Sequence, residues 1–574
     1  MCVEKSACIS ILSFVPGKSL FSLREMDDFV TSHSSFDYDV IIIGAGLTGM
    51  YALYRLRELG LSVHVIEKNG DVGGTWNMNR YPGCKLDSES YTYAYSFLDD
   101  LLQQWNWKRE FASQPELMEF FSLAADTMDV RKDILFNTKV VKAIFDEQDN
   151  GWTVELDNAE VLRSRFLLTC VGALSTPNMP KYPGMDMFRG ETYHSYYWPH
   201  DRNGYGGKRV DFRGKRVGVI GTGATGVQIV TEVAKTAGEL YVFQRHPNWC
   251  APLCDKPISA ERMAGIKQRY KEIFAQCEST TSGFQHDFLH TSAEGSTAEE
   301  REALFEELYG QSGYGIWVGH YADAFTDPKV NGYITDFIAS KIRQRVKDPA
   351  VAEKLIPKDH GFGLKRVPME SGYYEVYNQD NVTLVDLMEN PIEELTPEGI
   401  RTRNIAYDLD VIIYATGFDA IIGGLKEMDI RGVGGKTLKE AWENGPFTYL
   451  GLQVPDFPNL FTLVAAHNGA TFCNIPRCSE AQVNWVMDMF GHIVKTGIER
   501  VEADERAAEQ WTQHVYDVAN ETLLTTAKNS WFWSEFGKGT QRGHRLLVYN
   551  GGNPAYRTRV SEVEANGYEG FLMR

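Results

Sequence analysis

Two glycine-rich loops, at residues 44–49 and 221–226, have the spacing G-x-G-x-x-G that binds the pyrophosphate of a dinucleotide. Their glycines are Gly44, Gly46 and Gly49 in the first loop and Gly221, Gly223 and Gly226 in the second. The first glycine of such a loop allows a tight turn, the second lets the backbone approach the phosphates, and the third lets helix and strand pack closely. These residues therefore predict that one chain binds two dinucleotide cofactors.

The residue that follows the next strand indicates which dinucleotide each loop binds. After the first loop, a strand predicted over Ser62–Ile66 ends at Glu67, about 20 residues beyond the glycines, where an acid binds ribose hydroxyls and repels a 2′-phosphate. After the second loop, a strand predicted over Leu240–Phe243 leads to Arg245 without an acid, and a guanidinium matches phosphate geometry. The first loop therefore favours FAD or NAD and the second favours NADPH. A duplication with one inactive site is the alternative interpretation.

Apolar sequence on both sides of the loops predicts a Rossmann-like setting. The β-branched run Val40–Ile43 predicts a buried parallel strand directly before the first loop, and Tyr51–Leu59 predicts a helix after it. Val217–Ile220 precedes the second loop in the same way. Strand, glycine loop and helix in this order make the glycine pattern informative. The predicted fold class is therefore α/β, with two Rossmann-like dinucleotide-binding domains.

The order of the predicted elements divides the chain into parts. These are an N-terminal extension over residues 1–37, an FAD-binding domain formed by residues 38–178 and 415–574, and an NADPH-binding domain over residues 179–414. Between about residues 253 and 356 the sequence becomes charged and helix-periodic, for example over Ala260–Gln276 and Thr297–Tyr309. This stretch is interpreted as a helical insertion in the NADPH-binding domain.

Composition and charge limit the partners of the chain. The 574 residues carry a formal charge of −19 and are 43% hydrophobic, which is ordinary for a globular protein of two or three domains. The negative charge argues against nucleic acid as a partner. No apolar run approaches the roughly 18 residues that span a bilayer, and residues 1–37 lack the basic start and cleavage site of a signal peptide. We expect a cytoplasmic protein without an integral membrane segment, monomeric or weakly oligomeric, that binds small molecules.

The nine cysteines are scattered along the chain, and the two closest in sequence, Cys250 and Cys254, do not form a C-x-x-C pair. An odd number of dispersed cysteines in a large chain predicts reduced thiols. No spacing of cysteines and histidines is typical of zinc, so no metal site is predicted.

Two further segments carry fixed residues at the spacing of a known family. Residues 188–199, FRGETYHSYYWP, fit the pattern F-x-G-x-x-x-H-x-x-x-W-[P/D]. Residues 73–87 fit the pattern [A/G]-G-x-W-x-x-x-x-[F/Y]-P-[G/M]-x-x-x-D. Both resemble the patterns of type I Baeyer–Villiger monooxygenases, and Ala-Thr-Gly-Phe-Asp at residues 415–419 is similar to the linker of that family. The resemblance covers about residues 38–557.

The resemblance implies an enzyme that uses FAD, NADPH and O2 to convert ketones to esters or lactones. In that family NADPH reduces FAD, the reduced flavin and O2 form a C4a-peroxide, and the peroxide attacks the ketone carbonyl. Sulfides are a second substrate class of such enzymes. The cofactor supplies the chemistry, while the protein must protect and orient an anionic intermediate, which calls for a fixed cation.

The resemblance also assigns roles to single residues. Arg366 is expected to stabilise the anionic intermediate, and Asp87 to hold Arg366 as an ion pair, which makes these two the predicted catalytic residues. Lys365 is expected to contact the NADPH phosphate beside Arg245. Trp531 is expected to reach the nicotinamide ribose.

Other residues of the two family patterns are expected to support the cofactors. Gly74, Thr75 and Trp76, together with Asp87, are predicted to bind cofactor, and Gln114 to contact the nucleotide. In the other segment, the fixed residues are predicted to couple NADP binding to flavin chemistry at the domain junction, with Trp198 packed beside His194. They are Phe188, Gly190, His194 and Trp198.

The substrate pocket and the reaction class leave alternatives open. His467 and Phe472 are predicted pocket residues because their loop, residues 465–474, lies where the family builds its ketone pocket, but the sequence does not identify the ketone. Rival interpretations are a flavin monooxygenase that oxidises amines or sulfides, an N-hydroxylating amino-acid monooxygenase, and an NADPH oxidase that releases peroxide. Trp198 and the pair of Arg366 with Asp87 favour the Baeyer–Villiger interpretation.

Overall fold

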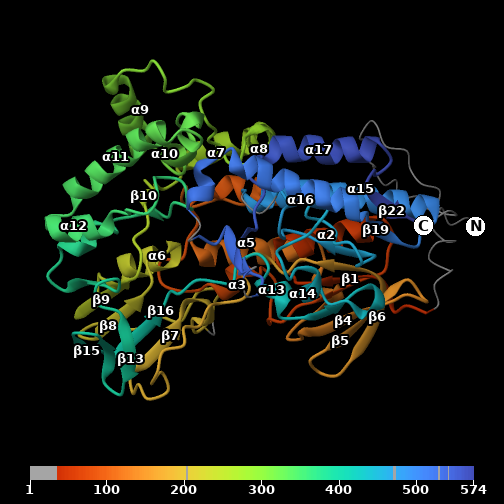
Figure 1. Cartoon of the computed structure of the whole chain (residues 1–574), viewed down its shortest axis with the longest axis horizontal. Helices are drawn as coiled ribbons and strands as arrows, with labels where there is room; N and C mark the ends of the chain where they lie inside the picture. The colour runs from red at the N-terminus through yellow and green to blue at the C-terminus, as the bar shows by residue number, and fades with distance from the viewer. Residues whose placement is uncertain (1–34, 202–203, 470–472, 528–529, 539, 541) are drawn as a thin grey trace, which may run out of the picture.

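The computed structural model describes residues 35–201, 204–469, 473–527, 530–538, 540 and 542–574. Two sheets lie side by side, and a layer of helices runs across both of them (Figure 1). None of the described helices is long and apolar enough to cross a membrane. The predicted α/β fold class with two Rossmann-like sheets is confirmed.

The first sheet has the strand order β17-β4-β5-β6-β1-β2-β3, with β18 also paired to β6. Its strands are β1 Tyr38–Ile43, β2 Val63–Ile66, β3 Ile134–Leu135, β4 Val140–Asp146, β5 Gly151–Leu156, β6 Val161–Thr169, β17 Asp429–Arg431 and β18 Leu460–Thr462. β1 is parallel to both of its neighbours, and Val40, Ile41 and Ile42 are completely buried. β-Branched residues suit such a strand because helices cover both faces of a parallel sheet. β17 and β18 come from residues 429–462, so two distant parts of the chain form this sheet.

The second sheet is wholly parallel and has the order β12-β9-β8-β16-β7. Its strands are β7 Glu191–His194, β8 Arg216–Ile220, β9 Glu239–Gln244, β12 Val382–Asp386 and β16 Val411–Tyr414. A small antiparallel sheet of β13 Ile392–Thr396, β14 Gly399–Thr402 and β15 Ala406–Asp408 lies beside it. The two glycine loops follow β1 and β8, at the carboxyl ends of parallel strands, where open α/β sheets bind ligands.

The helices that follow the glycine loops are α2 Leu47–Glu58 and α6 Ala224–Val233. The other helices outside the insertion are α3 Thr75–Met78, α4 Asp99–Gln104, α5 Gln114–Thr127, α13 Gly423–Lys426, α14 Leu438–Ala441, α15 Ile475–Thr496, α16 Glu505–Asn520 and α17 Asn553–Ala565. The remaining strands form short pairs: β10 Ala251–Pro252 with β11 Met369–Glu370, β19 Val501–Ala503 with β22 Phe571–Met573, and β20 Trp533–Phe536 with β21 Gly543–Leu546. α15, from near the end of the chain, packs against α2 near its beginning.

The region around residues 253–356 is mainly helical and projects beyond the second sheet (Figure 1). Its helices are α7 Ala260–Gln268, α8 Tyr270–Ser279, α9 Ala298–Gly310, α10 Gly315–Val318, α11 Pro328–Arg345 and α12 Pro349–Leu355. The helix-periodic stretch Ala260–Gln276 forms two helices, because Arg269 leaves the helical conformation at φ −114° and separates α7 from α8. The break lets each helix bury its own apolar residues, such as Ile266 and Phe274.

The prediction of reduced thiols is wrong at one place. Cys473 and Cys478 are paired as a disulfide, because the turn into α15 brings their Cα atoms to 6.3 Å. Their sequence separation of five residues does not fit a C-x-x-C motif, so the sequence did not single out this pair. The free cysteines of the described chain are Cys84, Cys170, Cys250, Cys254 and Cys277.

Candidate active site

The first and third glycines of each loop are required by the protein itself. Gly44 and Gly221 have φ values of +103° and +108°, which favour glycine. A Cβ atom on Gly44 would lie 2.6 Å from the carbonyl oxygen of Cys170, and one on Gly221 would lie 2.3 Å from that of Ala415. At the third glycines, Cβ atoms would lie 1.9 Å from Gly44 O and 2.1 Å from Gly221 O, so helix and strand touch there.

The second glycine of each loop is not required by crowding within the protein. No atom lies within 4 Å of a Cβ built on Gly223, and the nearest atom to one on Gly46 is Gly74 Cα at 3.7 Å. These two glycines are the N-caps of α6 and α2, which have no side-chain cap and no acidic residue in the first turn. The helix dipole and the first N–H groups there favour an anion. The space and the polarity of both loops fit the pyrophosphate of a dinucleotide.

Glu67 lies where an acid was expected, at the end of β2 and against the first loop. Its carboxylate accepts hydrogen bonds from the backbone N–H of Ala45 at 2.7 Å and of Asn69 at 2.8 Å. Burial raises the pKa of Glu67, against the effect of these hydrogen bonds. The acid therefore fixes the shape of the loop that it adjoins.

Residues 73–87 run from the first glycine loop to the helix of the second. Gly73 N donates to Ala45 O at 3.1 Å at one end. At the other, the Tyr81 hydroxyl donates to Gln228 Oε1 of α6 at 3.0 Å. A Cβ on Gly83 would lie 2.6 Å from Glu232 Cγ, so the Pro-Gly turn lies directly on α6. The segment connects the two nucleotide folds.

Partly buried hydrogen bonds hold this segment in place. Gln114, predicted to contact the nucleotide, donates from Nε2 to Trp76 O at 2.7 Å and to Tyr205 O at 3.0 Å. The Trp76 indole N–H donates to the Tyr93 hydroxyl at 3.2 Å. These contacts give Gln114 a role in positioning the backbone of Trp76.

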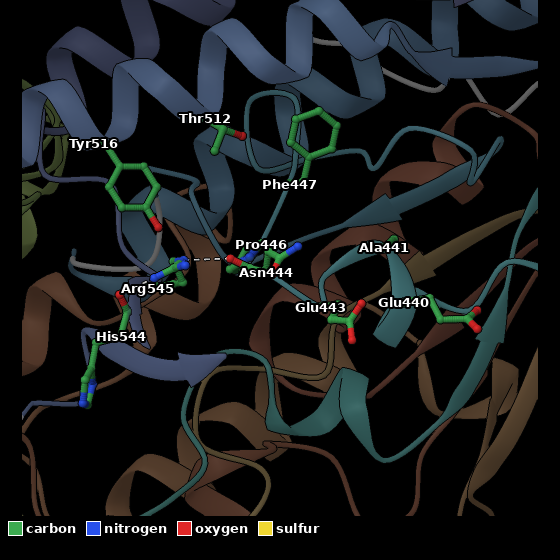
Figure 2. Close-up of a pocket in the computed structure, with 11 residues that line it drawn as sticks. Glu440, Ala441, Glu443, Asn444, Pro446, Phe447, Thr512, Tyr516, His544 and Arg545 are labelled. Carbon is green, nitrogen blue, oxygen red and sulfur yellow. Dashed lines mark hydrogen bonds between the residues drawn. The ribbon is translucent and has the colours of Figure 1, made fainter. Parts of the chain in front are cut away.

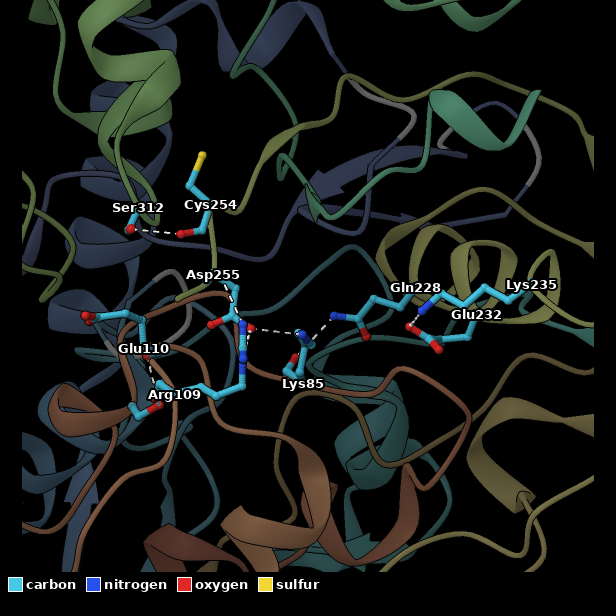
Figure 3. Close-up of polar contacts among 10 residues, drawn as sticks. Lys85, Arg109, Glu110, Gln228, Glu232, Lys235, Cys254, Asp255 and Ser312 are labelled. Carbon is cyan, nitrogen blue, oxygen red and sulfur yellow. Dashed lines mark hydrogen bonds and ion pairs between the residues drawn. The ribbon is translucent and has the colours of Figure 1, made fainter. Parts of the chain in front are cut away.

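Charged residues anchor the same segment to the helical insertion (Figure 3). Asp255 accepts from Lys85 Nζ at 3.2 Å and from Arg109 Nε at 2.7 Å. Gln228 Nε2 of α6 also donates to Lys85 O at 3.2 Å. Asp87 is two residues beyond Lys85, so contacts from two other parts of the fold restrain its position.

Asp87 and Arg366 form an ion pair, although 279 residues separate them in the sequence. Arg366 keeps 31% of its side-chain surface exposed, and Asp87 keeps 15%. Burial opposes the charge of Arg366, but Asp87, Tyr314 and Tyr81 raise its pKa above the usual value. The guanidinium is therefore a permanent, oriented cation that a small molecule can still reach.

His246 lies just beyond the end of β9. Burial lowers the pKa of His246, and the charges of Arg245 and Lys365 lower it further. Lys365 Nζ is bound to Asp359 at 3.1 Å, and the other Asp359 oxygen contacts His360 Nδ1 at 2.6 Å. Burial opposes the charge of Asp359, yet His360 and Lys365 lower its pKa to about 2. A carboxylate therefore lies within a cationic region, which the sequence alone did not indicate.

His194 ends β7 and contacts the linker that leaves β16. Its Nδ1 accepts from Tyr196 N at 3.2 Å, and its Nε2 lies 3.5 Å from Thr416 Oγ1. Burial lowers its pKa, so the ring is neutral at pH 7. Trp198 packs on Tyr193 with ring centroids 4.9 Å apart and donates to Lys208 O at 3.1 Å. Phe188 and Gly190 are in contact just before β7, where a Cβ on Gly190 would lie 2.4 Å from the Phe188 ring.

Trp531 is partly buried and packs edge-on against Phe532, with ring centroids 4.6 Å apart. It precedes the β20–β21 hairpin, which is bound to the loop after α14. Arg545 Nε donates to Asn444 O at 2.8 Å beside a hollow of about 490 Å³ (Figure 2). The Lys538 ammonium pairs with Glu443 at 2.8 Å.

Of the two predicted pocket residues, Phe472 lies outside the described residues. His467 is completely buried, with Nε2 bonded to Leu546 O at 2.9 Å and its own carbonyl accepting from the Trp511 indole at 3.1 Å. Burial lowers the pKa of His467 to about 4, so the ring is neutral at pH 7. The structure gives His467 a role in holding the C-terminal strands, and its contacts do not support the predicted pocket role.

Glu89 and His286 form a partly buried pair near the candidate site that the sequence did not predict. Glu89 follows Asp87 by two residues, and its Oε1 lies 3.1 Å from His286 Nε2. Burial opposes protonation of His286, but the hydrogen bond and charge of Glu89 raise its pKa above 6.5. Only the three-dimensional contact reveals this pair, since 197 residues separate its members.

Replacing His286 with asparagine is expected to destabilise the protein most in acid. Because the folded-state pKa of His286 is raised, its contribution to stability is complete below 6.5 and falls as the pH rises through the folded value. The loss of melting temperature should be roughly 2 °C greater at about pH 5.5 than at about pH 8.5. Thermal unfolding scans of both proteins measure this difference, and equal losses at the two pH values would contradict it.

Comparisons with known proteins identify the family. The model of the flavin-binding monooxygenase-like family matches residues 37–257. The chain is 51% identical over 533 residues to 2-oxo-Δ3-4,5,5-trimethylcyclopentenylacetyl-CoA monooxygenase of Pseudomonas putida, covering 93% of this chain and 98% of the relative. It is 39% identical over 539 residues to a Baeyer–Villiger monooxygenase of Pseudooceanicola batsensis, covering 93% and 96%. The chain belongs to the Baeyer–Villiger monooxygenases.

A solved structure agrees with this membership. The crystal structure of OTEMO in complex with FAD and NADP superposes with a TM-score of 0.91 at 50% identity, covering 94% of this chain and all of that one. Because the match covers 94% of this chain, it is not confined to one of the two sheets. Both glycine loops and the segment ending at Asp87 lie within residues 37–257 of the family match.

Proposed function

We propose that this Baeyer–Villiger monooxygenase binds FAD at the first glycine loop and NADPH at the second, and converts ketones to esters or lactones. One ketone, one O2, one NADPH and one proton give one ester, one NADP⁺ and one water. The observation that carries the proposal is the Arg366–Asp87 pair, an oriented cation beside the segment that joins the two nucleotide folds. In this proposal residues 38–178 and 415–574 hold FAD, and residues 179–414 hold NADPH.

Arg366 has the central role among the residues of the site. When bound, FAD accepts the hydride of NADPH and activates O2. The Arg366 guanidinium places positive charge where negative charge develops on the reacting oxygens, and a preorganised charge costs no reorganisation during the reaction. Asp87 orients Arg366 and balances its charge while no reactant is present. The raised pKa keeps Arg366 protonated throughout.

Other residues would bind and orient the two cofactors. Glu67 would bind the ribose of FAD beside its loop, and Arg245 and Lys365 would bind the 2′-phosphate of NADPH. Trp531 would donate its indole N–H to the nicotinamide ribose. His194 is neutral and contacts the linker at Thr416, which suits coupling of the two folds better than proton transfer.

Cyclic ketones are the first substrate class that we propose. The name of the Pseudomonas putida relative specifies a cyclopentenone ring that carries an acetyl-CoA side chain. Simple cyclopentanones and cyclohexanones, and the same rings with an acidic or thioester side chain, therefore belong in the first panel. Sulfides are the second class, since activated oxygen also reacts with sulfur.

Incubation of the FAD-loaded protein with NADPH, air and this panel tests the proposal directly. Mass spectrometry should detect lactones that are one oxygen atom heavier than their ketones. The panel also includes a sulfide and a tertiary amine. If only these two were oxidised, the protein would be a flavin monooxygenase that oxidises amines or sulfides. Consumption of NADPH with release of hydrogen peroxide, and no oxygenated product across the panel, would contradict the proposed reaction.

Replacing Asp359 with asparagine is expected to lower the KM for NADPH. The Asp359 carboxylate holds the Lys365 ammonium at 3.1 Å and would repel the 2′-phosphate that Lys365 binds. Partly exposed charge pairs are worth up to about 1 kcal/mol, which corresponds to a decrease in KM of about twofold to fivefold. Initial rates over a range of NADPH concentrations measure it.

NADH and a second variant provide the controls for this experiment. The KM for NADH, which lacks the 2′-phosphate, should not change in Asp359→Asn. Arg245→Ala should instead raise the KM for NADPH, because it removes a cation. A rise in the KM for NADPH in Asp359→Asn would mean that Asp359 positions Lys365 rather than competing for it.

A further inference from the structure

Two cysteine sulfurs meet beside the first turn of α15. Cys473 immediately precedes the N-cap residue Asn474, and Cys478 is in the first turn of the helix. A Cβ built on Gly283 would lie 2.8 Å from Cys473 Sγ and 3.1 Å from Cys478 Sγ, so both sulfurs pack against this glycine. Gly283 also has φ +68°, which favours glycine. The Cα separation of 6.3 Å is within the range that a disulfide can span.

We propose that Cys473 and Cys478 are a reversible redox site, in which a peroxide closes the disulfide and a small thiol opens it. The two positions differ in access: Cys473 is partly buried, whereas Cys478 is 4% exposed. The positive end of the α15 dipole favours a thiolate at these positions. Cys473 is therefore the attacking thiol and Cys478 the resolving one.

Each step balances with hydrogen peroxide as the oxidant. The Cys473 thiolate attacks one peroxide oxygen, the O–O bond breaks, and a sulfenic acid and hydroxide form; a proton converts the hydroxide to water. The Cys478 thiol then displaces the sulfenic oxygen as a second water, forming the S–S bond. Two electrons have moved from the sulfurs to the peroxide. A thiol reductant reverses the change by exchange through a mixed disulfide.

The free cysteines of the described chain are in environments that suppress this chemistry. Cys84 and Cys277 are buried, and burial raises the pKa of each thiol to about 12. Burial also raises the pKa of Cys170 and of Cys250. Cys254 is the most exposed of the five, and burial raises its pKa too. Since the thiolate is the reactive form, these groups react slowly at pH 7.

The first turn of α15 is bound to the segment that follows Asp87. Asn474 donates from N to Ser282 O at 2.9 Å and from Nδ2 to Thr92 Oγ1 at 3.0 Å. Arg477 donates to Ala94 O, and Glu480 accepts from Ser96 N at 2.9 Å. Thr92 is only five positions beyond Asp87. The redox state of the pair therefore acts on the part of the chain that positions the candidate active site.

Peptide mapping of the full-length, FAD-loaded protein tests the site without any assay of activity. Trypsin cleaves after Arg477, so Cys473 is in the peptide 440–477 and Cys478 in the peptide 478–495. After treatment with hydrogen peroxide and alkylation, the two peptides should appear as one linked species, two hydrogens lighter than their sum. A small thiol added before alkylation should abolish it. Independent alkylation of both cysteines after peroxide treatment would overturn the proposal.

Ketone kinetics test the connection to the active site, which rests on the proposed function. Reduction should raise the KM for ketone at least threefold in the wild type and in the control Cys254→Ser, and leave it unchanged in Cys473→Ser. A shift that persists in Cys473→Ser would overturn the connection. If no ketone reacts at all, the proposed function fails, while the linked peptide still decides whether the redox site exists.

Discussion

Arg366→Ala is expected to lower ester formation at least a hundredfold while FAD remains bound and NADPH is still oxidised. Removing one preorganised donor to a developing negative charge typically costs about a hundredfold to a thousandfold in rate. The glycine loops that would bind the cofactors do not include Arg366, so the hydride should still transfer and oxygen should leave as hydrogen peroxide. Measuring ester, peroxide and NADPH in one reaction gives the partition between the two outcomes.

Two further measurements separate chemistry from folding in this prediction. Arg366→Ala leaves the Asp87 carboxylate without its partner, and breaking a buried pair costs about 3–5 kcal/mol, which is an upper limit here because Arg366 is partly exposed. Arg366→Lys keeps a cation beside Asp87 and should melt close to the wild type, yet recover only part of the ester yield, since lysine lacks the planar fork. A normal ester yield in Arg366→Ala would contradict the role proposed for Arg366.

Gly223→Ala is expected to raise the KM for NADPH more than tenfold without changing the melting temperature. The added Cβ would meet no protein atom within 4 Å, so the fold has no reason to lose stability. It would instead occupy the space through which the pyrophosphate approaches the backbone. Thermal unfolding without cofactor and initial rates with NADPH test the two halves of this expectation.

Gly221→Ala is the matched control, two positions away in the same loop. Its Cβ would lie 2.3 Å from Ala415 O at a φ of +108°, so the protein itself must shift. A loss of stability of about 1–3 kcal/mol is expected from the backbone conformation alone. If Gly223→Ala lowered the melting temperature as much as Gly221→Ala, the second glycine would be a structural requirement, and the space assigned to the cofactor would be wrong.

Local sequence patterns predicted the parts of the fold whose causes are local. The runs around Val40 and Val217 are strands because their apolar residues are continuous, and the glycines end them at positive φ. Helix-periodic sequence did not reveal the break at Arg269, where the backbone leaves the helical conformation.

Contacts that form only in the folded chain account for the features of the site that the sequence did not predict. The pairing of Asp87 with Arg366 was available only through family resemblance, because 279 residues separate them. The Glu89–His286 pair and the Asp359 carboxylate beside Lys365 matched no known pattern. His467 was assigned to the pocket because its loop lies where the family builds the ketone pocket, but tertiary packing buries the side chain.

The strand order of the two sheets determines which sheet can be completed first while the chain is being synthesised. The second sheet is built wholly from residues 191–414, so it can close as soon as β16 has left the exit tunnel. The first sheet, although it starts with β1, lacks β17 and β18 until residue 462 has been made, and α2 lacks its cover until α15 follows. The nascent chain must keep its earliest strands from aggregating for tens of seconds at bacterial or eukaryotic elongation rates. Chaperone dependence should therefore fall on residues 38–169, which contain β1 to β6 and belong to the sheet that is started first and completed last.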